Sequence, residues 1–180
     1  MKLKNIYLHF KTISKHKWYV FKFSIRAGIP FRGLMHDLSK FSPTEFFENI
    51  RYIEGTSHSP ITSTRKVQGY SKAWLHHRGR NKHHPEYWYD RYSRIKAPVM
   101  EYKYAVEMIC DKLAAGIVYE GKKWDANRHL EYVKKSRDDK YLNEKTYNFV
   151  VEIFTQIAEN GIKNTITSKN LKRVYKEKCT

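Results

Sequence analysis

Three long segments carry apolar residues every three or four positions, which is the spacing of one face of an α-helix. The first covers residues 4–27, and its repeating positions include His9 and His16. The second runs from Val99 to about Glu120, and the third covers residues 143–160. Helices of this length bury their apolar faces against one another, so the sequence predicts an all-α helical bundle of about seven or eight helices.

Shorter helices are predicted between these segments. Ser42-Pro43-Thr44-Glu45 combines a capping serine, a proline suited to the first helical position and a glutamate that completes a capping box. This helix should end before Gly55. Further helices are predicted at residues 71–78, 85–92 and 125–135. His129, in the last of them, is interpreted as a packing or surface residue.

The longest predicted loop is residues 55–69, because Ser, Thr, Gly and Pro dominate its composition. Loops of this length often act as lids or binding loops, and disorder is the alternative. His58 is therefore a candidate for touching a substrate.

The chain of 180 residues is interpreted as one domain, residues 1–180. It divides into a ligand core at about residues 9–118, C-terminal helices at 125–160 and a basic tail at 165–180, predicted to form a frayed helix. The hydrophobic share of 41% is typical of a folded chain. Two cysteines, Cys110 and Cys179, indicate neither a disulfide framework nor a cysteine-based zinc site.

The net charge of +17 is compatible with three kinds of partner or surface. It suits an anionic, phosphate-bearing small molecule, a nucleic acid, or a lysine-rich surface that keeps the protein in solution. The charges are spread along the chain and form no compact basic block. Lysines also interrupt the early apolar runs, so we expect no secretory signal, no membrane contact and a cytoplasmic location.

Potential metal ligands cluster around the stretch Met35-His36-Asp37-Leu38-Ser39-Lys40. Adjacent His and Asp can offer a nitrogen and an oxygen to the same metal or metal pair. His16 lies upstream, and Asp111 lies downstream on the apolar face of a helix. A carboxylate in that setting is costly to bury unless it is paired or metal-bound, which favours Asp111 as a ligand. Lys40 follows Asp37 by about one helical turn and could reach the same site.

Two histidine pairs, His76-His77 and His83-His84, form a second candidate centre. Adjacent helical residues point about 100° apart, so one member of each pair should face the metals; we favour His77 and His84. Between the pairs lie three residues that could hold phosphate oxygens or form a solvated basic turn: Arg78, Arg80 and Lys82. His9 is interpreted as a core residue or as a neighbour of the ligands. Glu107 either orients a ligand or is an exposed helix residue.

The order His16, His36-Asp37, His, His, Asp111 resembles the HD-domain superfamily of metal-dependent phosphohydrolases. The resemblance implies an HD-domain-like helical bundle in which four His and two Asp hold two divalent transition metals, with Asp37 bridging them. Iron or manganese suits this mixed nitrogen and oxygen ligation. It also implies hydrolysis of a phosphate ester, with Lys40 and Arg78 as catalytic residues that balance phosphate charge. Many members have Gly immediately before that Lys, where this chain has Ser39.

Two longer strings, Ala73-Trp74-Leu75-His76-His77 and Asn81-Lys82-His83-His84-Pro85-Glu86-Tyr87-Trp88, are similar to the uncharacterised DUF5662 family. That resemblance implies no activity. The six-ligand order also resembles HD-domain di-iron oxygenases, which are the main alternative among enzymes. A third interpretation is a basic nucleic-acid-binding module without catalysis, in which protein ligands would close the metal site.

Overall fold

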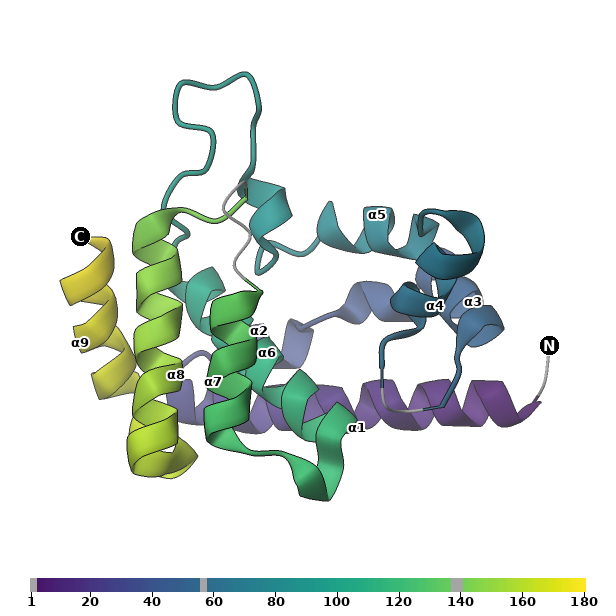
Figure 1. Ribbon diagram of the computed structural model, residues 1–180, viewed down its shortest axis with the longest axis horizontal. Helices are drawn as coiled ribbons and strands as arrows, with labels where there is room; N and C mark the ends of the chain where they lie inside the picture. Colours follow the sequence, from purple (N-terminus) through teal and green to yellow (C-terminus); the bar gives the residue numbers. More distant parts are fainter. Residues whose placement is uncertain (1–2, 56–57, 137–140) are drawn as a thin grey trace.

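The computed structural model describes residues 3–55, 58–136 and 141–180. Within these ranges the chain forms nine α-helices, three short 3-10 helices and no strand, so the all-α prediction is confirmed (Figure 1). The α-helices are α1 (Leu3–Ala27), α2 (Pro30–Met35), α3 (Pro43–Tyr52), α4 (Pro60–Gln68), α5 (Lys72–Arg78), α6 (Tyr102–Glu120), α7 (Ala126–Lys135), α8 (Glu144–Thr165) and α9 (Ser168–Cys179). The 3-10 helices are η1 (Leu38–Phe41), η2 (Pro85–Trp88) and η3 (Gly121–Lys123).

Helix α1 is the long base on which the other helices are arranged (Figure 1). Helices α2 and α6 pack against it, and α3, α4 and α5 gather near its N-terminal half. Helices α7, α8 and α9 pack together at its other end. None of the described helices combines the length and the apolar character that a membrane crossing requires.

The buried core joins α6 to α1, α8 and α9. Val106, Ile109 and Leu113 of α6 are fully buried, and they pack in the same cluster as Val20 and Phe149. A helix surrounded by others is apolar on most of its faces. The two acidic residues of α6 that lie among these apolar positions, Glu107 and Asp111, therefore need partners in the interior.

Helix α4 contradicts the prediction of a loop at residues 55–69. Ser59 caps the helix by accepting a hydrogen bond from the backbone N–H of Ile61, and Pro60 occupies its first position. Gly69 ends it with a φ of 78°, a conformation that glycine adopts easily. Residues 56–57 of the predicted loop lie outside the described residues. Composition misled here because Ser63 and Thr64 are buried on the inner face of α4.

Two further boundaries differ from the prediction. The aromatic segment at residues 85–92 forms only η2, Pro85–Trp88, and then continues as turns and bends up to α6. At the C-terminus the predicted frayed tail is instead the ordered helix α9. Leu171 and Val174 of α9 are fully buried in the main core, while its lysines remain on the outer face. The basic composition of this segment concealed an amphipathic helix.

We expect Leu171→Ala to lower the free energy of unfolding by about 2–5 kcal/mol, because it deletes a fully buried side chain and leaves a cavity. Lys172→Ala, at the exposed neighbouring position, should change it by less than about 0.5 kcal/mol. Chemical denaturation followed by circular dichroism measures both. Equal stability of the two variants would contradict the packing of α9 in the core.

Candidate metal centre

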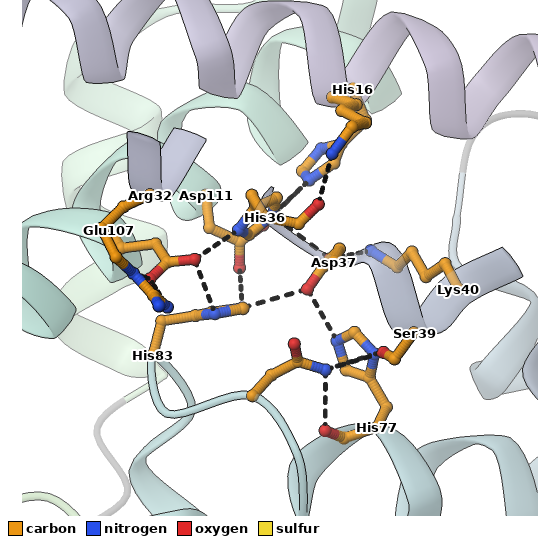
Figure 2. A network of polar contacts seen from close by, with 12 residues as sticks. His16, Arg32, His36, Asp37, Ser39, Lys40, His77, His83, Glu107 and Asp111 are labelled. Atoms are coloured by element: carbon orange, nitrogen blue, oxygen red, sulfur yellow. Dashed lines mark hydrogen bonds and ion pairs between the residues drawn. The ribbon is translucent and has the colours of Figure 1, made fainter. Parts of the chain in front are cut away.

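Residues distant in the sequence converge at one buried site between α1, α2, α5 and α6 (Figure 2). His16 comes from α1, and His36 and Asp37 lie at the junction of α2 and η1. Asp111 comes from α6, and its Oδ1 lies 3.5 Å from Nε2 of His36. The predicted convergence of these four residues is therefore confirmed.

The first group that could hold a metal ion consists of His16, His36, Asp37 and Asp111. Nε2 of His16 lies 3.0 Å from Oδ1 of Asp111 and 3.4 Å from Nε2 of His36. Nε2 of His36 lies 3.2 Å from Oδ2 of Asp37. Donors that share one ion at about 2.0–2.2 Å lie roughly 3 Å from one another, so these separations fit a common metal.

The second group consists of Asp37, His77, His83 and His84. Nε2 of His77 lies 3.3 Å from Oδ1 of Asp37, and Nε2 of His83 lies 3.4 Å from the same oxygen. Asp37 therefore belongs to both groups, with Oδ2 facing His36 and Oδ1 facing His77 and His83 (Figure 2). A third possible group, His36, His83 and Glu107, lies in the same cluster.

Several polar atoms of the cluster are buried without a hydrogen-bond partner among the described residues. They are Oδ1 of Asp37, both ring nitrogens of His83 and Nε2 of His84. Buried polar atoms normally have a partner, so several unpaired atoms in one place indicate that an ion or water binds there. The donor set and its unpaired atoms therefore fit a metal ion.

The backbone of Asp37 is unusual. Its φ of 52° is the only positive value at a non-glycine residue in the described part of the chain. The left-handed conformation costs an L-residue roughly 1–2 kcal/mol, and aspartate tolerates it better than most. Here it reverses the chain between α2 and η1, where both the His36 and the Asp37 side chains face the cluster. Strain of this kind is typical of functional sites.

The electrostatics of the cluster keep its carboxylates ionised. Although burial opposes it, the imidazoles of His36 and His16 hold the pKa of Asp111 well below its usual value. Burial lowers the pKa of His16, and burial together with His83 and His77 lowers the pKa of His84. Although burial opposes it, Asp37, Asp111 and Glu107 raise the pKa of His36 well above its usual value, so a metal bound by this ring would have to displace its proton.

Glu107 lies behind two of the histidines and forms a hydrogen bond with one of them, His36. Its carboxylate is buried, and Nδ1 of His36 donates to Oε1 at 3.0 Å. Arg32 donates to Oε2 of the same carboxylate at 2.8 Å, which balances its charge. Nδ1 of His83 lies 3.4 Å from Oε1. Of the two interpretations of Glu107, the exposed one is wrong, because its side chain is buried; its carboxylate instead fixes which nitrogen of His36 faces the cluster.

Glu45 plays the same part for His77, which the sequence interpretation missed. Its backbone N–H donates to the Ser42 hydroxyl, but its side chain does not complete the capping box. Instead its buried carboxylate accepts from Nδ1 of His76 at 2.7 Å and from Nδ1 of His77 at 2.8 Å. This contact turns Nε2 of His77 toward Asp37 and leaves His76 outside the possible ligand groups.

The two histidine pairs thus differ in outcome. In the first pair His77 joins a possible ligand group and His76 does not, so the prediction of His76 as a ligand is not supported. In the second pair both His83 and His84 belong to the same group. The expectation that only one member would face the site does not hold there, because His83 and His84 lie in a non-helical turn after α5.

A family model described as "Family of unknown function (DUF5662)" matches residues 5–156. The chain belongs to this family. The matched region contains every predicted ligand from His16 to Asp111. Searches of curated proteins and of solved structures gave no match.

A cavity of about 160 Å³, here called the near cavity, adjoins the cluster of this DUF5662 chain. His16, His77, His84 and Asp111 lie in its wall, as does Lys40, whose ammonium donates to Oδ2 of Asp37 at 2.5 Å. Although burial opposes it, Asp37 and Asp111 raise the pKa of Lys40, which therefore stays charged.

Some of the other predicted residues line the near cavity and others do not. His9 and His58 line it, and burial and the charge of Lys40 lower the pKa of His9 to about 4. Arg78, Arg80 and Lys82 are not among its lining residues. The ammonium of Lys82 lies instead 5.4 Å from the ring centre of Tyr87. Of the four predicted phosphate-binding residues, the structure places Lys40 at the cavity.

We expect Glu45→Gln to weaken metal binding by the DUF5662 chain roughly 10–100-fold, because an amide cannot hold both imidazoles through accepted hydrogen bonds as the carboxylate does. Competition with a chromophoric chelator measures the affinity. Glu48→Gln is the matched control on the same helix, since Glu48 caps α5 through Ser71 and touches no ligand. Equal affinity of the Glu45→Gln and wild-type proteins would contradict this assignment.

Proposed function

We propose that this protein is a metal-dependent phosphohydrolase of the HD-domain type, with a dinuclear centre. The observation that carries the proposal is the position of Asp37. Its two oxygens face two different groups of histidines, 3.2 Å from His36 on one side and 3.3 Å from His77 on the other. A carboxylate shared in this way suits two ions held at a fixed spacing.

In this proposal His16, His36 and Asp111 would hold one ion, His77 with His83 or His84 would hold the other, and Asp37 would serve both. Four imidazoles with two carboxylates suit iron or manganese better than calcium or magnesium. When bound, such a pair lowers the pKa of water and stabilises the charge that develops during phosphoryl transfer.

The residues of the chain would bind and orient the ester. The Lys40 ammonium lies in the wall of the near cavity and would offer charge-assisted hydrogen bonds to phosphate oxygens. Glu107 and Glu45 hold the histidines in place from the interior. The near cavity is also lined by Ile13, Ile53 and Trp74, and such apolar walls limit the access of water and strengthen electrostatic contacts.

A di-iron oxygenase is the second candidate, and the abundance of imidazole supports it. Five histidines belong to the possible ligand groups, His16, His36, His77, His83 and His84. Imidazole-rich sites suit iron, and the ligand order of HD-type oxygenases resembles the order found here.

Metal analysis of protein purified without added metal, followed by activity screens with and without oxygen, tests the proposal. A phosphohydrolase should contain up to two transition metals per chain and hydrolyse a phosphate ester anaerobically with manganese or iron. An oxygenase should consume dioxygen only with a specific organic substrate, and zinc should not replace iron. A nucleic-acid-binding module should show neither activity, and its affinity should fall steeply with salt. Anaerobic inactivity of metal-loaded protein on a broad phosphate-ester panel would overturn the hydrolase.

A further inference from the structure

A second cavity, here called the far cavity, lies next to the near cavity, between α6, α7 and the beginning of α4. Its volume is about 490 Å³, within the range of small-molecule sites. The two cavities share five lining residues: His58, Ser59, Asp111, Ala115 and Tyr119. Asp111, Ala115 and Tyr119 are spaced four residues apart on one face of α6. The far cavity therefore adjoins the proposed metal centre at Asp111.

The far cavity carries a cation that forms no ion pair among the described residues. Lys112 lines it and is half-buried, and no carboxylate of the described residues lies within ion-pair distance of its ammonium. Glu120 also lines the cavity, but its Oε2 lies 2.6 Å from Nη2 of Arg128. Glu120 is thus already paired. The charges of Asp111 and Glu86 act on Lys112 without forming an ion pair, so its ammonium can still bind an anion.

His129 adds a hydrogen-bond donor to the same wall. It is 2% exposed, and its Nδ1 accepts a hydrogen bond of 3.1 Å from the indole N–H of Trp124. Because burial lowers its pKa, the ring is neutral and its one proton lies on Nε2. That Nε2 is buried without a partner among the described residues. A buried donor left unpaired in the wall of a cavity calls for an acceptor.

The ring of His129 is tightly packed between its neighbours. A Cβ at Gly116 would lie 2.2 Å from Cε1 and Nδ1 of His129, so any side chain there would displace the imidazole. Phe154 stacks on the ring with centres 5.0 Å apart. The imidazole is therefore fixed between α6 and α8, which makes it a pre-oriented donor.

We propose that the far cavity binds a second acidic group of the substrate through the Lys112 ammonium and the Nε2–H of His129. The favoured substrates are then phosphate esters whose organic part carries a carboxylate or a second phosphate. This inference rests on the proposed phosphohydrolase, in which the first phosphate lies at the metal centre. It names a substrate class for that site, and the donors that select it lie on α6 and α7.

Titration calorimetry on the manganese-loaded protein tests the proposal with non-hydrolysable probes. Alkylphosphonates of two to five carbons are compared with phosphonates of the same length that end in a carboxylate. At the best length the carboxylate should tighten binding about tenfold, the value of one charge-assisted hydrogen bond. Lys112→Met should abolish this advantage, and His129→Phe should reduce it about threefold or more. Lys123→Met, at an exposed lysine, is the matched control and should retain it.

Equal affinity for the two probe series at every length, or an advantage that Lys112→Met retains, overturns the proposal. The hydrolase is judged separately, from turnover of the corresponding phosphate esters. A carboxylate advantage lost in Lys112→Met without any ester hydrolysis would overturn the hydrolase and leave the far site standing. Ester hydrolysis together with equal binding of both probe series would overturn the proposal for the far cavity and support the hydrolase.

Discussion

Asp37→Ala should remove most of the transition metal that the wild-type protein carries after purification. Asp37 is the one residue common to both four-residue groups, and its two oxygens face them separately. Its loss therefore takes a ligand from each ion at once. His36→Ala should also lose most of the metal, because His36 is fully buried beside Asp37 and Asp111. Mass spectrometry of metals per chain measures both variants.

His76→Ala is the matched control for this loss. His76 has the same chemistry and sits next to a proposed ligand, yet Glu45 holds its ring outside the possible groups. We expect the His76→Ala variant to keep its metal. Full metal retention in both Asp37→Ala and His36→Ala would show that the central pair is not a ligand set. Equal loss in His76→Ala would mean that stability, and not ligation, controls metal content.

The sequence predicted the convergence at this site because the ligands follow strong local signals. His16 and Asp111 each lie on the apolar face of a long helix, and such a position points a polar side chain inward. His36-Asp37 follows α2, the short helix that begins after the break indicated by Gly28 and Pro30. Helical periodicity thus located His16 and Asp111, and the resemblance to the HD-domain ligand order joined them with His36-Asp37.

The partners of the ligands could not be predicted in the same way. Glu45 occupied a capping-box position, and that local interpretation accounted for it fully until α3 was seen to pack against α5. Arg32 carries no sequence signal at all, since its partner Glu107 lies 75 residues away. The unpaired donor of His129 likewise depends on Trp124 and Gly116, whose contacts with it are tertiary or specific to a loop.

Helix α4, which was predicted as a loop, and α9, which was predicted as a frayed helix, show the limit of composition as a guide. Helix α4 is rich in Ser and Thr, and α9 is rich in Lys, so both had compositions typical of loops or tails. Burial decides otherwise: Thr64 of α4 and Leu171 of α9 are fully buried. Tertiary packing of one apolar or small face stabilises such helices despite weak intrinsic propensity.

Lys40→Ala should lower kcat/KM for a phosphate ester roughly 10²-fold or more while leaving the metal content unchanged. The expected loss of activity follows from removing a preorganised cation from the cavity beside the metals. The expected retention of metal follows from the positive charge of Lys40, which does not itself bind a cation. The Lys40 ammonium pairs with Oδ2 of Asp37, so removing it takes a positive charge away from a proposed bridging ligand. Steady-state kinetics and metal analysis of the same preparations measure the two effects.

Lys72→Ala carries the same change in net charge at an exposed position of α5, and it should match the wild-type protein in both measurements. This control separates the local effect of Lys40 from the general attraction of a basic protein for anions, which salt would screen. Loss of metal in Lys40→Ala would show that the lysine positions Asp37 and does not serve the substrate. Wild-type kinetics in Lys40→Ala would remove it from the proposed phosphate site.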